Sequence, residues 1–214
     1  MDEICIVQIS DTHVRMPDRL LKNNFDSNYA LTRAIEIINS ESYTIDCLLI
    51  TGDLVEDGLE GEYAHLKQIL NHLNRKIPVL FCLGNHDDID AFSRVFLDRF
   101  PQILNKSSMV SINCLDTDVG LNYCVDFQMS KLIVLDSSVK KEGWGKISSD
   151  ALDWLEKILS NTVTDTIILA LRAFFLRLYT IVFNTISILH AATIRRLCNS
   201  FFFLLIISNL CFHI

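Results

Sequence analysis

Three short segments of this 214-residue sequence combine carboxylate, imidazole and amide side chains, a mixture suited to holding metal ions. They read SDTH at residues 10–13, TGD at residues 51–53 and GNHD at residues 84–87. Carboxylate, imidazole and carbonyl oxygen are ligands for divalent metals such as Mn²⁺, Fe²⁺ or Zn²⁺. One carboxylate shared by two ions about 3.5–4 Å apart is an arrangement that serves phosphoryl transfer. These residue types therefore point to metal-assisted chemistry on a phosphate group.

Each of the three segments follows a short, continuous apolar run, as expected at the end of a buried strand. The runs cover residues 3–10, 45–50 and 78–83, and helix-like patterns lie between them. Strands that alternate with helices favour an α/β fold with parallel pairing at the front of the chain. Because ligands bind at the carboxyl ends of parallel strands, the polar segments are expected to meet at one rim.

The remaining patterns complete this outline. A first helix over residues 28–39 has Asp26 or Ser27 as its N-cap, and a third helix spans residues 90–99. The predicted inner faces of the four helices are Leu31, Ala34, Ile35 and Ile38; Tyr63, Leu66, Leu70 and Leu73; Phe92, Val95 and Phe96; and Leu152, Leu155 and Leu159. Further strands are predicted over residues 109–114, 122–127, 131–136 and 166–171.

Taken singly, each polar segment is a weak signal. A D-x-H triplet occurs often by chance, and a lone Asp at a strand end is more often a turn former. GNHD is more specific, because polar residues at the end of a buried strand are costly without partners. Gly52 and Gly84 each directly precede an expected ligand, where the chain needs positive φ or a close backbone approach. The ordered combination of all three segments favours a functional site.

The order SDTH, TGDLVEDG, LGNHDD resembles the calcineurin-like metallophosphoesterases. VQISDTHV and the later LIVLDSSVKKEGWGKISSDALDWLEKIL look most like the class III cyclic-nucleotide phosphodiesterase branch. The resemblance covers about residues 3–171 and implies an α/β sandwich of two β-sheets flanked by helices, with its C-terminal part incomplete here. It also implies hydrolysis of a small-molecule phosphodiester, 3′,5′-cyclic AMP above all, through attack by a hydroxide held between two metal ions.

The resemblance implies a metal-binding role for four residues. Asp11 and His13 would bind the first ion, Asp53 would bridge both ions, and Asn85 would bind the second. Fe²⁺ or Mn²⁺ are the expected divalent ions. Other phosphodiesters, nucleotides or phospholipid headgroups remain alternative substrates on the same metal centre.

The resemblance also implies two catalytic roles beside the metals. His86 would stabilise or protonate the departing alkoxide, and Asp87 would orient His86. Asp136, in the segment VLDSS, matches a family motif near the site but receives no assigned role.

Two further family segments, His-His-Pro or Gly-His-x-x-Pro and then Gly-His-x-His, have no counterpart in this sequence. The strand-like run ending at Leu171 is followed by RAFFLRLYTIVF, and the later histidines His190 and His213 lack the required neighbours. The second metal site is therefore expected to be incomplete, because Asp53 and a neutral amide are too few ligands for firm binding. The expected phosphodiesterase activity of this chain is correspondingly weak, and a non-catalytic remnant of the family is the alternative.

The chain changes character near residue 165. All 26 acidic residues lie at or before Asp165, and the following residues contain four arginines but no Gly or Pro. We therefore divide the chain into a phosphoesterase domain, residues 1–171, and a hydrophobic tail, residues 172–214. The tail is interpreted as a frameshift product or as a membrane-associating segment through residues 178–214. A frameshift would leave the second sheet with an unpaired strand edge, which favours aggregation.

Composition narrows the classes of partner. The formal net charge of −7 argues against nucleic acid or an anionic membrane surface as the main partner. The seven cysteines include no CxxC pair, which favours reduced thiols over a disulfide framework. The N-terminus runs directly into a strand-like segment and shows no secretory signal. We expect a cytoplasmic protein, with membrane association through the tail as the alternative, and the oligomeric state stays open.

Overall fold

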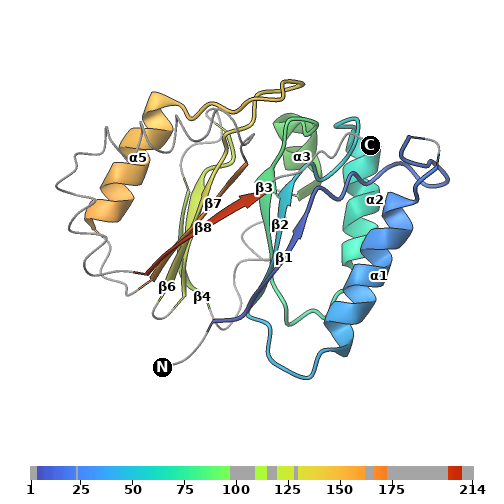
Figure 1. The fold of residues 1–214 in the computed structure, drawn as a ribbon, viewed down its shortest axis with the longest axis horizontal. Helices are drawn as coiled ribbons and strands as arrows, with labels where there is room; N and C mark the ends of the chain where they lie inside the picture. The colour runs from blue at the N-terminus through green and yellow to red at the C-terminus, as the bar shows by residue number, and fades with distance from the viewer. Residues whose placement is uncertain are drawn as a thin grey trace.

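In the computed structural model the described residues are 4–22, 24–96, 109–114, 120–127, 130–161, 166–172 and 202–208. Two β-sheets pack against each other, and helices cover the outer face of each sheet (Figure 1). The predicted α/β sandwich is confirmed.

The first sheet contains three parallel strands in the order β1 (Ile6–Ser10), β2 (Cys47–Gly52) and β3 (Val79–Leu83). The helices α1 (Ser27–Ser40), α2 (Glu60–Leu70) and α3 (Ile89–Phe96) lie together on its outer side (Figure 1). Every residue of the central strand β2 is buried, as both faces of that strand are covered. The three strands predicted at the front of the chain are therefore confirmed, and all their carboxyl ends point the same way.

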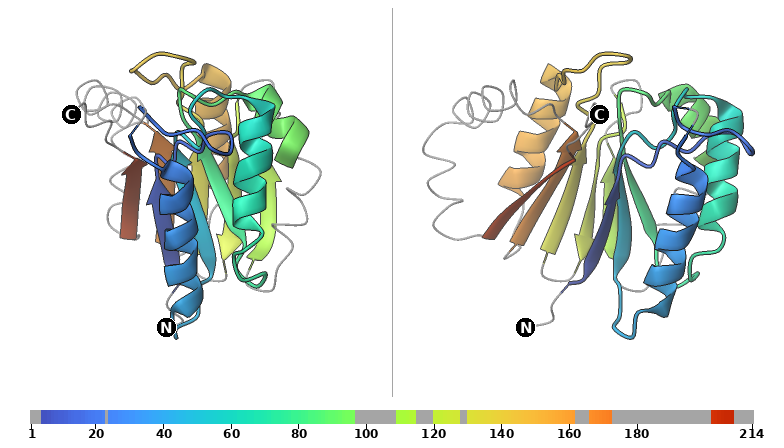
Figure 2. Two further views of the ribbon diagram at one scale, coloured as in Figure 1. Left: turned by 90° about the vertical axis from the view of Figure 1, so that its right-hand side faces the viewer. Right: turned by 45° about the vertical axis from the view of Figure 1, so that its right-hand side comes forward.

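The second sheet contains five strands in the order β4-β5-β6-β7-β8. The strands are β4 (Met109–Cys114), β5 (Tyr123–Phe127), β6 (Ser130–Leu135), β7 (Thr166–Arg172) and β8 (Phe202–Ser208). Pairing is antiparallel from β4 to β6 and parallel from β6 to β8. The helix α5 (Ser149–Ser160) joins β6 to β7 and lies outside this sheet (Figure 2).

The first helix begins as predicted. Asp26 is its N-cap, and its side chain accepts a 2.8 Å hydrogen bond from the Tyr29 backbone N–H. Its inner face buries Leu31, Ile35 and Ile38. The cap and the apolar stripe together explain why this segment is helical.

The inner faces of two other helices differ slightly from the prediction. In α2 the predicted Tyr63 and Leu66 are buried, while Ile69 is buried in place of the half-buried Leu70. The predicted Leu73 lies just after the helix and is buried as well. In α5 the buried residues are Ala151, Trp154 and Leu155. The indole of Trp154 therefore takes the place in the core that was expected for the half-buried Leu152 and Leu159. The predicted end of the third helix, residues 97–99, lies outside the described residues.

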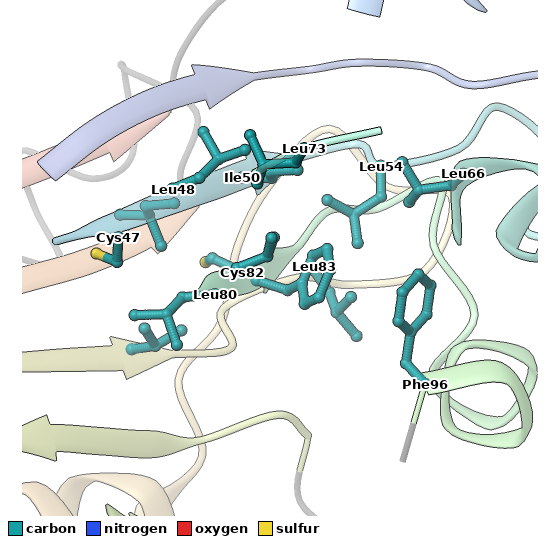
Figure 3. Close-up of a cluster of buried hydrophobic side chains, with 14 of the residues drawn as sticks. Cys47, Leu48, Ile50, Leu54, Leu66, Leu73, Leu80, Cys82, Leu83 and Phe96 are labelled. Carbon is teal, nitrogen blue, oxygen red and sulfur yellow. The ribbon is translucent and has the colours of Figure 1, made fainter. Parts of the chain in front are cut away.

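The core is continuous from the helices through the first sheet to the second. Figure 3 shows part of this core, in which Cys47 and Cys82 lie among leucines such as Leu48, Leu80 and Leu83. Both thiols are buried and neither forms a disulfide, and burial raises the pKa of the Cys47 thiol to about 12. These cysteines act as small hydrophobic residues, as the sequence predicted.

Part of the predicted tail belongs to the second sheet. Strand β8 pairs in parallel with β7 over its whole length, from Thr166 opposite Phe202 to Arg172 opposite Ser208. The edge of β7 is therefore covered by β8, and the expectation that a frameshift leaves an unpaired edge in this sheet stays a prediction. Within the described ranges, no helix has the length and apolar character needed to cross a membrane.

Candidate metal centre

The three polar segments meet at one rim of the first sheet, as predicted from the strand directions. Backbone pairing continues past the end of β1: the N–H of Asp11 donates to Thr51 O and the N–H of His13 donates to Asp53 O, both at 2.9 Å. These hydrogen bonds fix the loop after β1 against the loop after β2. The side chains of the two loops are thereby brought together by the sheet itself.

Backbone conformation at this rim is unusual. Asp11 has φ 53° and His13 has φ 42°, in the left-handed region that side-chain-bearing residues seldom adopt. Such strain is found mainly at functional sites, where the surrounding structure maintains it. Gly52 has φ 78°, and a Cβ there would lie 2.4 Å from Asp11 Oδ1. Both reasons predicted for a glycine before a ligand thus apply at Gly52.

Asp11, His13 and Asp53 form a compact group of metal-ligand type. One ligand atom from each lies within 4.8 Å of the others, and His13 Nε2 is 3.7 Å from Asp53 Oδ2. Asp53 is fully buried, and its Oδ1 accepts the backbone N–H of His86 at 3.0 Å. Asp11 Oδ2 is buried without a hydrogen-bond partner. A buried carboxylate oxygen left unpaired beside a second carboxylate fits a divalent cation, which would satisfy both.

Asn85 lies in the same loop as His86, directly after the end of β3, and is half-buried. Its backbone carbonyl accepts the N–H of Lys141 at 2.8 Å, which ties this loop to the segment after β6. The expected role of Asn85 as a ligand of the second ion remains a prediction.

His86 stands at the open side of the group, with its side chain 34% exposed. Its ring lies edge-on to that of His13, with centroids 5.2 Å apart and an interplanar angle of 84°. Its Nδ1 is 2.6 Å from the backbone carbonyl oxygen of Glu56. Because a carbonyl only accepts, this Nδ1 carries the proton when the ring is neutral, and Nε2 is left for the site.

Asp87 is buried and points into the scaffold. Its carboxylate accepts the backbone N–H groups of Gly84 at 2.8 Å and Leu54 at 3.0 Å, and the hydroxyl of Tyr63 at 2.8 Å. Burial raises the pKa of Asp87 to about 7, and these hydrogen bonds oppose that shift. The side chain therefore joins the loops after β2 and β3. The expected role of Asp87 in orienting His86 remains a prediction. The hydrogen bonds of Asp87 support that role only indirectly, because they hold the loop backbone from which His86 projects.

Glu56 is the residue that sequence reasoning missed. Its Oε2 is 2.6 Å from His13 Nδ1 and 3.6 Å from His86 Nδ1, and the three residues form a second group of possible ligands. Glu56 is the third residue after Asp53, in the turn that the sequence showed only as a loop. Its spacing from Asp53 was the one available signal, since both must lie at the same strand end.

Asp136 directly follows the end of β6. It accepts the N–H groups of Leu121 at 3.2 Å and Ser138 at 2.9 Å. With Asp87 and Lys140 it helps to line a pocket of about 370 Å³. Its contacts are those of a residue that shapes the loops around the rim.

Carboxylates and imidazoles gather at one rim of three parallel strands, backed by a second sheet, and form a candidate site for divalent cations in an α/β fold. A sequence profile described as "Calcineurin-like phosphoesterase" matches residues 5–176. The chain belongs to the calcineurin-like phosphoesterase family. Members of this family use a dinuclear centre of divalent metal ions, and the rim of this chain holds candidate ligand groups for such ions.

Several curated proteins are similar to the chain. A probable glycerophosphodiester phosphodiesterase of Arcobacter nitrofigilis is 31% identical over 72% of this chain and 51% of its own length. A probable cyclic nucleotide phosphodiesterase of Rhodococcus erythropolis is 32% identical over 78% of this chain and 50% of its own length. A cAMP/cGMP dual specificity phosphodiesterase of Mycobacterium tuberculosis is 28% identical over 78% and 48%. The chain thus spans about half the length of the curated relatives it matches.

Proposed function

We propose that the protein is a metal-dependent phosphodiesterase acting on a cyclic nucleotide, with 3′,5′-cyclic AMP as the substrate. The observation that carries this proposal is the group of Asp11, His13 and Asp53, in which a buried carboxylate oxygen of Asp11 has no protein partner. Relatives of the chain are named as cyclic nucleotide phosphodiesterases, which supports the substrate class.

Each residue of the rim has a proposed task. Asp11, His13 and Asp53 would hold the first ion, and Asp53 with Asn85 would contribute to the second. When bound, divalent ions neutralise phosphate charge and lower the pKa of water. His86 presents Nε2 at the exposed side of its ring, and when both ring nitrogens carry a proton it can give the Nε2 proton to the departing alkoxide and keep the Nδ1 proton hydrogen-bonded to Glu56 O. Asp87 would keep the backbone of His86 in place through its hydrogen bonds to both neighbouring loops.

We further propose that the 214-residue chain by itself binds metal weakly and hydrolyses its substrate slowly. Three of their side chains serve the first ion, but the second has only the shared Asp53 and the amide of Asn85. A neutral amide contributes little charge, so the second ion is held poorly. This proposal agrees with the absence of the family's later histidine segments from the sequence.

The test is hydrolysis of 3′,5′-cyclic AMP by the purified chain with added Mn²⁺ or Fe²⁺. Two forms are compared: the chain itself, and residues 1–171 fused to the C-terminal half of the Rhodococcus relative. We expect slow turnover by the chain and clearly faster turnover by the fusion. His86→Ala in the fusion should lower turnover by about 100-fold or more, as expected for a catalytic proton donor. Asp11→Asn in the fusion should also lower turnover, because it removes a charged ligand of the first ion. Rapid Mn²⁺-dependent turnover by the unfused chain would overturn the proposed impairment.

A second candidate substrate is a glycerophosphodiester, favoured by the similarity to the Arcobacter protein. The same two protein forms can be assayed with glycerophosphocholine and with 3′,5′-cyclic AMP. A higher kcat/KM for glycerophosphocholine would replace the cyclic-nucleotide assignment and leave the metal centre unchanged.

A further inference from the structure

We propose that Glu56 is a positioning residue that holds both imidazoles of the site, His13 through its carboxylate and His86 through its main-chain carbonyl. The expected effect of Glu56 on metal binding rests on the proposed function. Its expected effect on the two histidine rings does not, because that effect concerns hydrogen bonds of the metal-free protein.

In both contacts the histidine donates the hydrogen bond and an oxygen of Glu56 accepts it. Glu56 Oε2 lies 2.6 Å from Nδ1 of His13, and Glu56 O lies 2.6 Å from Nδ1 of His86. Both oxygens can only accept a hydrogen bond, so each Nδ1 must be the donor. A neutral ring has one N–H, and both rings are therefore held with the proton on Nδ1 and with Nε2 free of it.

For His13 this tautomer is the one that metal binding needs. Its Nε2 faces Asp53 and belongs to the group formed with Asp11. A carboxylate that accepts the other ring N–H of a metal-binding histidine fixes the ring orientation and raises the basicity of the ligand nitrogen. Glu56 stands in this relation to His13.

Glu56 is itself fixed. Its backbone N–H donates to Val14 O at 3.2 Å, and its carboxylate is 19% exposed. The next turn of chain is fixed by the buried carboxylate of Glu62, which accepts the N–H of Asp57 at 2.9 Å. Because its backbone is fixed in this way, a single acceptor group can restrict the orientation of a histidine ring.

A metal ion held by His13, Glu56 and His86 is the competing interpretation. Two ligand atoms bound to one tetrahedral Zn²⁺ at about 2.0–2.2 Å stand about 3.3 Å apart. The 2.6 Å separation of His13 Nδ1 and Glu56 Oε2 is too short for that and is a charge-assisted hydrogen bond. The geometry therefore favours positioning over ligation.

The first test reads the histidine tautomers of the metal-free full chain by long-range ¹H–¹⁵N NMR. It is run at about pH 8.5, two units above the usual imidazole pKa of about 6.5. In Glu56→Ala, His13 should become a mixture of the Nδ1–H and Nε2–H tautomers. His86 should keep its Nδ1–H form, because its acceptor is main chain. Glu56→Gln should preserve both rings, since the amide oxygen still accepts.

Two references make this test decisive. His65 Nδ1 lies 2.9 Å from the carbonyl oxygen of Arg15, so its unchanged Nδ1–H form reports an intact fold in each variant. Asp57→Asn removes the neighbouring negative charge without touching either ring and should change none of the three histidines. An unchanged His13 in Glu56→Ala overturns the proposal. Loss of the His86 tautomer while His65 is retained overturns the part assigned to the main chain.

The second test is titration of the same proteins with Mn²⁺, followed by calorimetry. Glu56→Ala should weaken binding by about 10- to 100-fold, as expected for loss of a partner behind a ligand. Glu56→Gln should weaken it less, and Asp57→Asn should leave it unchanged. Equal affinity of Glu56→Ala and the parent chain overturns the metal-binding consequence. Failure of the parent chain to bind any Mn²⁺ counts against the proposed function, whereas the tautomer result still decides the role of Glu56.

Discussion

At the scale of single residues, the rim of the first sheet leaves no room for a side chain at Gly84. A Cβ there would lie 2.1 Å from Asp53 Oδ1 and 2.6 Å from both Asp53 N and Gly52 C. The glycine is required by close approach of a carboxylate and of backbone, neither of which can move without disturbing the candidate metal-binding group.

The residue-scale prediction is that Gly84→Ala destabilises the fold by about 1–3 kcal/mol or more, as expected for overpacking a tight site. Gly61→Ala is the matched control, because a Cβ at Gly61 would meet only the flexible end of Met16, at 2.7 Å from its sulfur. Since Gly61 lies in α2, alanine there should be neutral or stabilising by up to about 1 kcal/mol. Urea unfolding measures both changes, and equal stability of the two variants would contradict the close-approach argument.

At the scale of elements, the start of α3 is stabilised by Asp88. Its Oδ1 accepts the N–H of Ala91 at 3.0 Å in the first turn, and its Oδ2 pairs with Lys140 from the segment after β6. The hydrogen bond from Lys140, followed by that from Ala91, lowers the pKa of Asp88 from its usual value. The helix start and the segment after β6 are thereby linked at the edge of the site.

The pH dependence of this link has a definite sign. The unfolded chain has an Asp pKa of about 3.9, and the folded pKa lies below it, so the stabilisation is present above about pH 4. It is lost as the pH falls through the folded pKa. Asn at position 88 keeps the cap but not the charge, so Asp88→Asn should cost about 0.5–1 kcal/mol at pH 7 and little once the pH lies below the folded pKa of Asp88. Urea unfolding across pH measures this, and the gap should disappear in a Lys140→Met background.

At the scale of the whole molecule, one tyrosine joins the two sheets. Strand β3 is the edge strand of the first sheet, and Tyr123 comes from β5 of the second. The Tyr123 hydroxyl donates to Phe81 O at 2.7 Å and accepts from Phe81 N at 2.9 Å. All of these groups are buried, so this hydroxyl satisfies an edge that water does not reach.

We therefore expect Tyr123→Phe to destabilise the protein by about 1–3 kcal/mol, the usual cost of leaving buried polar groups unsatisfied. Tyr29→Phe is the control, because Tyr29 is 62% exposed and its change should stay within about 0.5 kcal/mol. Thermal and urea unfolding compare the two variants. A stability loss at Tyr123 no greater than at Tyr29 would contradict the contribution assigned to the Tyr123 hydroxyl.

The sequence by itself determined the front half of the architecture. Apolar runs that end in polar residues, separated by helical stripes, predicted β1, β2 and β3 and brought Asp11, Asp53 and Asn85 to one rim. These features are local, since burial sets the periodicity of each element and the strand direction fixes which end carries the ligands. The need for Gly52 and Gly84 was likewise visible in their place before those ligands.

Only the tertiary structure decided the contacts between distant parts of the chain. The Glu56 carboxylate is hydrogen-bonded to His13, 43 residues away in the sequence, and the Tyr123 hydroxyl to the backbone of Phe81, 42 residues away. The place of β8 beside β7 was also visible only in the folded structure, because a short apolar run does not indicate which strand it pairs with. Hydrophobic patterning records how much of a residue is buried, whereas the identity of its partner is set only when the elements pack.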